Sequence, residues 1–197
     1  MKKLLLAITL TLALAVTANA QDVGQIWVGG SLGIETSKTG DYDRINNYNI
    51  TPELGYVLNS DLAIGMRIGY KHAEEAYKSY NDEDYSLGFV YGKEKYDGFE
   101  VNPFIRYTFL KGDIGGLFLD GGVGYAYLKN KATDVKTNTY EVGIRPGVAL
   151  ALSEKVVLTG RFGHLGYTHS KAGSEKSDKF EFNLKMNNIL LGVNVIF

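Results

Sequence analysis

The sequence contains no cysteine, and this absence excludes several kinds of structure and chemistry. Without cysteine there can be no disulfide bond, no thiolate metal ligand and no cysteine nucleophile. Histidine is also scarce, with three residues in 197, and their spacing is not typical of a metal site. We therefore expect no metal and no cofactor, and we expect stability to come from packing and sheet closure.

The chain also lacks an excess of charge of either sign. Its 21 Lys and Arg residues are matched by 22 Asp and Glu residues, which gives a formal net charge of −1. Proteins that bind nucleic acids usually carry a basic surplus that neutralises phosphates. We therefore expect no nucleic-acid partner.

A long apolar run occurs at the N-terminus only. A basic segment, residues 1–3, precedes the apolar run from Leu4 to Val16, and Ala18-Asn19-Ala20 has the small-x-small pattern of a signal-peptidase site. The run is too short to cross a bilayer comfortably. We predict that residues 1–20 are a cleaved signal peptide and that residues 21–197 form one domain.

Apolar and polar residues alternate through the remaining sequence. In Leu62–His72, for example, Leu62, Ile64 and Met66 alternate with Ala63, Gly65 and Arg67. Successive side chains of a strand point to opposite faces, so this pattern predicts two-faced strands. Eight segments of about ten residues, the length that a tilted strand needs to cross a bilayer, show it: 25–35, 49–58, 62–72, 99–109, 117–128, 140–152, 156–168 and a last segment from about 180 to 197.

The connections between these segments alternate in length. Asn59–Asp61 and Ser153–Lys155 are tight, whereas the connections after the first, third, fifth and seventh segments are long and polar. Short periplasmic turns and long extracellular loops are typical of outer-membrane barrels. We predict an all-β fold, an eight-stranded antiparallel up-and-down transmembrane β-barrel.

A soluble eight-stranded barrel would show the same alternation, and side-chain size distinguishes the two. The polar face combines many glycines with a few long charged residues, among them Gly65, Gly69 and Arg67. Glycines weaken a solvated strand, but they would leave room for guanidinium groups inside a narrow lumen. Aromatic residues near strand ends, Trp27 included, are expected in the interfacial girdles.

Charged residues on the small-residue face are the candidate functional group of this chain. If Leu58 pairs with Leu62, Glu53 lies opposite Arg67, and we predict an ion pair between them. Charges in a confined interior are costly unless they are paired. We interpret the set as a plug of salt bridges, with a gated ion path as the alternative; its members are Glu53, Arg67, Glu100, Arg106, Asp120, Glu141, Arg145 and Arg161.

The last strand has an apolar face that ends on an aromatic residue, formed by Ile189, Leu191, Val193, Val195 and Phe197. Together with the segments ITPELGYVL, VNPFIRYTFL, IRPGVALAL and RFGHLGY, this strand resembles the small outer-membrane barrels of the OmpA/OmpX type, the porin-family barrels of Gram-negative bacteria. The resemblance implies residence in outer-membrane lipid. It also implies that the last strand is recognised by the barrel-assembly machinery and closes the barrel against the first strand.

Some small barrels of this kind are lipid A-modifying enzymes, so the histidines are candidate catalytic residues. His164 is followed two residues later by Gly166, where the lipid A deacylase barrels have serine, and Ser170 beside His169 has no evident orienting carboxylate. We expect one lipid-facing or rim histidine, two loop histidines, no catalytic residue and no enzyme activity.

The long polar connections are rich in tyrosine, a residue that is common in recognition surfaces. The candidates are Tyr42, Tyr77, Tyr80 and Tyr85. We expect a monomeric barrel with a structural or surface-interaction role and an unidentified extracellular partner. A small passive pore is the first alternative, and a lipid A-modifying enzyme is a disfavoured second.

Overall fold

The computed structural model describes residues 23–37, 44–80, 89–112, 114–184 and 190–197. The predicted signal peptide lies outside these residues, as do Tyr42, Tyr85 and Ile189. No helix in the described part of the chain could span a lipid bilayer.

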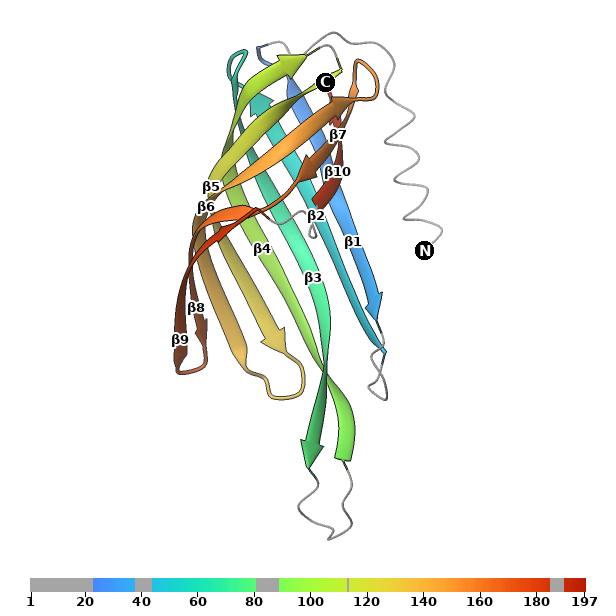
Figure 1. Cartoon of the computed structure of the whole chain (residues 1–197), viewed down its shortest axis with the longest axis vertical. Helices are drawn as coiled ribbons and strands as arrows, with labels where there is room; N and C mark the ends of the chain where they lie inside the picture. The colour runs from blue at the N-terminus through green and yellow to red at the C-terminus, as the bar shows by residue number, and fades with distance from the viewer. Residues whose placement is uncertain (1–22, 38–43, 81–88, 113, 185–189) are drawn as a thin grey trace.

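The described residues form ten antiparallel strand segments (Figure 1). They are β1 (Ile26–Ser37), β2 (Ile45–Val57), β3 (Leu62–Tyr80), β4 (Phe89–Gly112), β5 (Gly115–Asn130), β6 (Lys136–Ala151), β7 (Val156–Arg161), β8 (His164–Ala172), β9 (Glu175–Asn183) and β10 (Leu190–Ile196).

Eight of these segments close into a ring in the order β1-β2-β3-β4-β5-β6-β7-β10, with β10 paired back to β1. The predicted seventh strand corresponds to β7 and β8, and the predicted eighth strand corresponds to β9 and β10. The all-β, eight-stranded antiparallel barrel predicted from the sequence is therefore confirmed. Where β7 and β10 complete the ring, each strand has two neighbours, and its backbone groups are satisfied within the sheet, as a bilayer requires. Towards the long hairpins, among the described residues, residues 32–37 of β1 pair only with β2, and β9 pairs only with β8.

The tight turns lie at one end of the barrel and the long hairpins at the other (Figure 1). At the tight end, Leu58 N donates to Leu62 O at 2.9 Å and Leu152 N donates to Val156 O at 2.8 Å. These two bonds close the predicted turns at Asn59–Asp61 and Ser153–Lys155. The predicted register across the first turn is confirmed, because Glu53 lies opposite Arg67.

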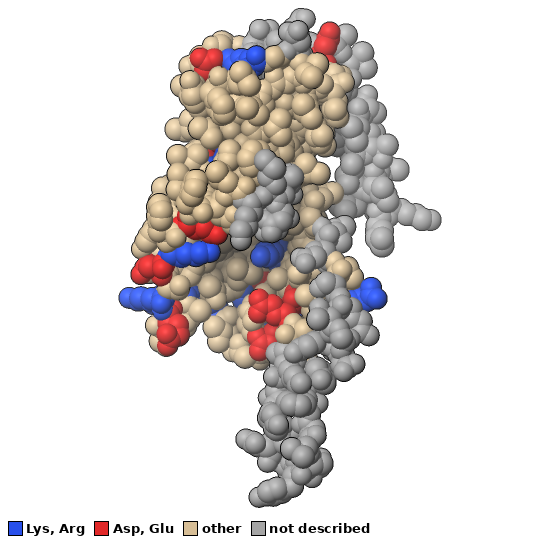
Figure 2. All heavy atoms as spheres, viewed as in Figure 1, with Lys and Arg blue, Asp and Glu red and all other residues tan. Residues whose placement is uncertain are grey.

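The aliphatic side chains cover the outside of the ring, as the alternation predicts. Leu54 is 55% exposed and Ile68 is 53% exposed. On the visible face, almost no charged side chain reaches the surface of a broad belt between the two ends (Figure 2). Tyr70, Phe99 and Tyr127 lie on the outer face towards the long hairpins, with the Phe99 and Tyr127 rings 5.4 Å apart. Such a belt with flanking aromatics matches the hydrocarbon region of a bilayer and its interface.

Trp27 does not belong to a girdle, which corrects that prediction. It is 2% exposed and packs inside the barrel with Val57, Ala63, Phe104 and Ile196. The reason is parity, since Ile26 and Val28 on either side of it face outward. The lumen has room for the Trp27 ring because the residue opposite it on β2 is Gly55, which has no side chain.

Glycines provide this space at three places in the lumen. A Cβ atom at Gly55 would overlap the ring of Trp27, and one at Gly65 would overlap the ring of Phe104. Gly147 is related in the same way to the ring of Phe118, which is 1% exposed. These glycines of the polar face therefore leave space for aromatic rings. The arginine side chains lie over those rings.

A break separates β7 from β8, although the sequence predicted one continuous strand over 156–168. Strand β6 pairs Gly147 with Arg161 of β7 and Ile144 with Leu165 of β8, a register that differs by one residue. Gly163, between the two segments, has φ of +70°, a conformation that glycine adopts readily. Beyond this break, β8 and β9 form a hairpin that extends from the ring (Figure 1).

The β3–β4 hairpin reaches furthest from the barrel (Figure 1). Its strands remain paired from Ala73 opposite Tyr96 to Tyr80 opposite Phe89. Most of this long polar connection is thus a two-stranded ribbon, the protruding hairpin that the alternation of residues 85–92 in the sequence suggests. Tyr77 and Tyr80 lie on the backbone of β3, but their side chains are outside the described part of the structure.

Candidate functional site

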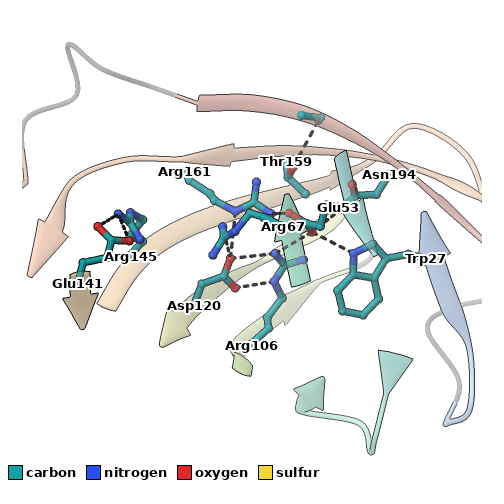
Figure 3. A network of polar contacts seen from close by, with 11 residues as sticks. Trp27, Glu53, Arg67, Arg106, Asp120, Glu141, Arg145, Thr159, Arg161 and Asn194 are labelled. Atoms are coloured by element: carbon teal, nitrogen blue, oxygen red, sulfur yellow. Dashed lines mark hydrogen bonds and ion pairs between the residues drawn. The ribbon is translucent and has the colours of Figure 1, made fainter. Parts of the chain in front are cut away.

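Five of the eight predicted lumen charges form one connected network across the inside of the barrel (Figure 3). Each residue occupies an inward position on a different strand, β2, β3, β4, β5 or β7. The five residues are Glu53, Arg67, Arg106, Asp120 and Arg161.

Glu53 is the first acceptor of this network, and its side chain is 2% exposed. The carboxylate accepts hydrogen bonds from Trp27 Nε1 at 2.9 Å and from Arg106 Nη2 at 3.3 Å. Arg161 Nη2 and Asn194 Nδ2 donate to it as well, the latter at 3.3 Å. Four donors from β1, β4, β7 and β10 thus meet on one buried carboxylate.

Asp120 is the second acceptor, and its side chain has no exposed surface. Arg106 donates from Nε to Oδ1 at 2.7 Å and from Nη2 to Oδ2 at 3.0 Å, a bidentate contact. Arg161 Nε and Arg67 Nη1 donate to Oδ2 at 3.0 and 3.3 Å. The two carboxylates therefore join three arginines that come from three separate strands.

Aromatic rings hold the guanidinium groups in place. The Arg106 guanidinium lies 4.1 Å from the centre of the Phe118 ring, and the Arg67 guanidinium lies 4.2 Å from the centre of the Phe104 ring. A desolvated cation over an aromatic face gains energy of about 2 kcal/mol. These contacts fix the arginines over the rings that the lumen glycines accommodate.

The predicted Glu53–Arg67 ion pair is wrong, although the register that suggested it is correct. Glu53 pairs with Arg106 and Arg161, and Arg67 pairs with Asp120. The two residues are cross-strand neighbours, but their long side chains extend across the lumen to other strands. Cross-strand pairing predicts short-range contacts, whereas these contacts depend on the curvature of the closed barrel.

The remaining three predicted charges lie outside the network. Arg145 Nη2 donates to Glu141 Oε1 at 2.8 Å and to Oε2 at 2.9 Å, within β6. Glu100 has no hydrogen bond or ion pair with another described residue. Across the turn Ser153–Lys155, the register of the sequence would place Arg145 opposite Gly163, but the break after β7 removes Gly163 from the ladder.

Sequence reasoning missed two members of the site, Trp27 and Asn194. Both lie at inward positions between outward apolar neighbours, and parity is the signal that could have identified them. A lone asparagine inside the apolar segment ILLGVNVIF indicates a polar partner, which the structure shows to be Glu53.

The described apolar residues of the last strand share one face, as predicted. Leu191, Val193 and Phe197 are exposed on the outside, and Val195, which lies opposite the outward Val28 of β1, is on the same face although it is 5% exposed. Asn194 and Ile196 face the lumen. Ile26 and Phe197 exchange backbone hydrogen bonds at 3.1 and 2.8 Å, so β10 closes the ring at its tight end.

The histidines do not occupy their predicted environments. His164 faces the lumen between Gly143 and Gly166, and its buried Nε2 has no hydrogen-bond partner among the described residues. The other two lie on strands and pair with aspartates. His72 Nδ1 lies 2.5 Å from Asp97 Oδ1, and His169 Nδ1 lies 2.6 Å from Asp178 Oδ1.

Among the described residues, neither histidine–aspartate pair is hydrogen-bonded to a serine or threonine. Ser170, next to His169, shares a hydrogen bond of 3.0 Å with Thr139 Oγ1, on the opposite face of β8 from the histidine. Outside the belt, Lys131 and His72 lower the pKa of Asp97 to about 2. An ionised Asp97 therefore acts here as an ion-pair partner of the extracellular rim.

No group of three or more metal-ligating side chains is found among the described residues. A closed antiparallel ring with an apolar outer belt and a charged, side-chain-filled lumen defines an integral outer-membrane β-barrel. The chain belongs to the family of outer membrane protein beta-barrel domains, whose family model matches residues 4–197. Its location is therefore the outer membrane.

Several solved structures are similar to this chain. Neisserial surface protein A (NspA) is 14% identical with a TM-score of 0.51, and the match covers 90% of this chain and 100% of that one. Ail, the attachment invasion locus protein of Yersinia pestis, is 13% identical with a TM-score of 0.39, over 89% and 99% of the two chains. The E. coli outer membrane protein W is 8% identical with a TM-score of 0.45, over 90% and 100%. No curated protein matches this chain.

Proposed function

We propose that this protein is a non-enzymatic outer-membrane barrel that presents an extracellular interaction surface on a scaffold with a blocked lumen. The observation that carries this proposal is the buried network of Glu53, Asp120 and three arginines, which crosses the lumen from β2 to β7. A charged side chain that is held by several hydrogen-bond partners is not easily displaced by a passing solute.

The proposed interaction surface is the β3–β4 hairpin. It continues for eight further residue pairs beyond His72, from Ala73 opposite Tyr96 to Tyr80 opposite Phe89. At its base Glu74 is 5% exposed, accepts a bond from Asn46 N at 2.9 Å and lies 3.2 Å from Lys93 Nζ. A ribbon anchored in this way projects from a rigid support, and rigid scaffolds commonly carry recognition segments.

The histidine environments support a non-catalytic role. A hydrolase of this type needs a nucleophile, a base and an orienting acid within hydrogen-bond reach of one another. His169 has its aspartate but not its serine, and His164 has neither. We also propose that residues 1–20 direct export and are removed, that the assembly machinery recognises β10, and that the barrel works as a monomer in outer-membrane lipid.

The hairpin proposal is tested by shortening the ribbon. Residues 76–93 are replaced by an Asn-Gly turn, and adhesion of intact cells to immobilised serum and extracellular-matrix proteins is measured. We expect most of the adhesion to disappear, because the projecting ribbon is gone while the barrel below it is intact.

The matched control replaces the β5–β6 loop, residues 131–135, with the same turn. We expect this variant to adhere like the wild type, and both variants to keep heat-modifiable gel mobility as evidence of folding. Full adhesion by the folded, shortened variant would contradict the assignment of the hairpin.

A further inference from the structure

Among the described residues of the lumen, two opposite charges remain uncompensated after the ion pairs are assigned. The network joins three arginines to two carboxylates, so it holds one positive charge in excess. Arg67 is the least compensated of its arginines, since its one hydrogen bond to a described residue is the 3.3 Å contact with Asp120, a carboxylate that Arg106 and Arg161 share. Glu100 is the carboxylate without a described partner.

Both residues line the same cavity on the extracellular side of the network. The cavity has a volume of about 150 Å³, and the hydroxyls of Ser31 and Thr51 and the amide of Asn102 also line it. Arg67 lies opposite Asn102, and Glu100 lies opposite Gly69, so the two charged residues are diagonal neighbours on β3 and β4. The side chain of Glu100 passes over Gly69, where a Cβ atom would lie 2.6 Å from its Cγ.

We propose that this cavity binds a small zwitterion of the amino-acid class. Its carboxylate pairs with the free N–H groups of Arg67, and its ammonium group pairs with Glu100. The hydroxyls and the amide of the cavity wall take the remaining hydrogen bonds. A cavity of this volume holds a molecule of roughly six heavy atoms, the size of benzene, glycine or alanine.

Charge on the cavity wall disfavours the two simpler ligands. A plain anion would meet Arg67 but would leave Glu100 unpaired beside it. A plain cation would meet Glu100 in the field of Arg67 and Arg161, because Arg145 is paired with Glu141 on the same cavity wall. Burying a like charge or an unpaired charge is costly. A ligand that carries both charges is therefore preferred to either half.

The experiment uses the barrel refolded in detergent micelles and three probes: glycine, acetate and methylammonium. Binding is followed by the NMR shifts of the Arg67 Nε–H and the Asn102 side-chain amide. We expect saturable shifts with glycine and an apparent Kd at least tenfold lower than with acetate or methylammonium. This comparison needs no variant, so it does not depend on whether a substituted barrel folds.

Two substitutions then assign the charges. Arg67→Met should abolish glycine binding, and Glu100→Gln should remove the preference for glycine over acetate. Arg44→Met and Glu175→Gln make the same chemical changes at exposed positions away from the cavity and should bind glycine like the wild type.

Three results would overturn the proposal. Equal affinities for acetate and glycine would show an anion site only. Absence of saturable glycine binding up to about 100 mM would show that the two charges are satisfied in another way. Unchanged glycine selectivity in a folded Glu100→Gln barrel would remove the ammonium contact.

Discussion

At the residue scale, Glu53 connects more parts of the barrel than any other side chain discussed above. It accepts from Trp27 on β1, Arg106 on β4, Arg161 on β7 and Asn194 on β10. The strands that begin and end the ring therefore meet in one carboxylate. A buried carboxylate with several charged donors is costly to remove, because the donors stay buried when it is gone.

Glu53→Ala should therefore destabilise the folded barrel by about 3–5 kcal/mol, the usual cost of breaking a buried ion pair. Urea unfolding of the refolded protein in detergent measures the change. Glu175→Ala removes an exposed carboxylate from β9 and should leave the free energy of unfolding within about 0.5 kcal/mol of the wild-type value. Equal midpoints for Glu53→Ala and wild type would show that the network does not stabilise the fold.

Gly55 and Gly121 offer a matched pair of glycine-to-alanine substitutions. A methyl group at Gly55 would overlap the Trp27 ring, which its bond to Glu53 holds in place, whereas one at Gly121 meets nothing within 4 Å on the outer face. We expect Gly55→Ala to cost about 1–3 kcal/mol by overpacking and Gly121→Ala to be neutral or slightly stabilising. Urea unfolding again measures both, and a larger loss in Gly121→Ala would contradict the proposed packing.

The sequence predicts which face a residue occupies better than it predicts the partner of that residue. Alternation placed Glu53, Arg67 and Arg161 in the lumen, because parity is a local property of an extended chain. The partners could not be predicted from it, since a guanidinium reaches across the lumen to strands that lie far apart in sequence. Trp27 shows a different limit, because general aromatic preference suggested a girdle where parity indicated the lumen.

At the element scale, the break between β7 and β8 divides the barrel into a closed part at the tight turns and an extended part at the long hairpins. The predicted third strand ends at residue 72 and the predicted fourth begins at residue 99. In the structure, β3 continues to Tyr80 and β4 already begins at Phe89. Polar residues in these extensions are compatible with either a loop or a solvated ribbon. Polarity does not distinguish the two, and the alternation of residues 85–92 in the sequence is the signal that favours a protruding hairpin.

Gly163→Ala tests the conformation at this break. Gly163 has φ of +70°, and an added Cβ would overlap the carbonyl oxygen of Asn183. Gly173 in the β8–β9 turn has φ of +59° but open space around it. We expect Gly173→Ala to cost about 1 kcal/mol and Gly163→Ala to cost more. Urea unfolding measures the stability of both variants. If Gly163→Ala is as stable as Gly173→Ala, or more stable, the backbone at the break is not constrained.

At the scale of the whole molecule, the barrel is apolar outside, charged inside and extended at one end only. The apolar belt accounts for residence in the membrane, and the network accounts for a narrow barrel whose interior is filled by side chains. The sequence was sufficient for the fold class, because strand number, strand length and the alternation of connections are all local patterns. The closure of β10 on β1 was predicted through the family resemblance and is seen in the backbone bonds of Ile26 and Phe197.

The most direct test of the blocked lumen is single-channel recording of the refolded wild-type barrel in a planar lipid bilayer. A lumen crossed by Glu53, Asp120 and their three arginines should give no regular, steady conductance steps after insertion. Insertion is verified independently by protease protection of the reconstituted barrel. Uniform, long-lived current steps from the inserted wild-type protein would contradict the account and favour the passive-pore alternative.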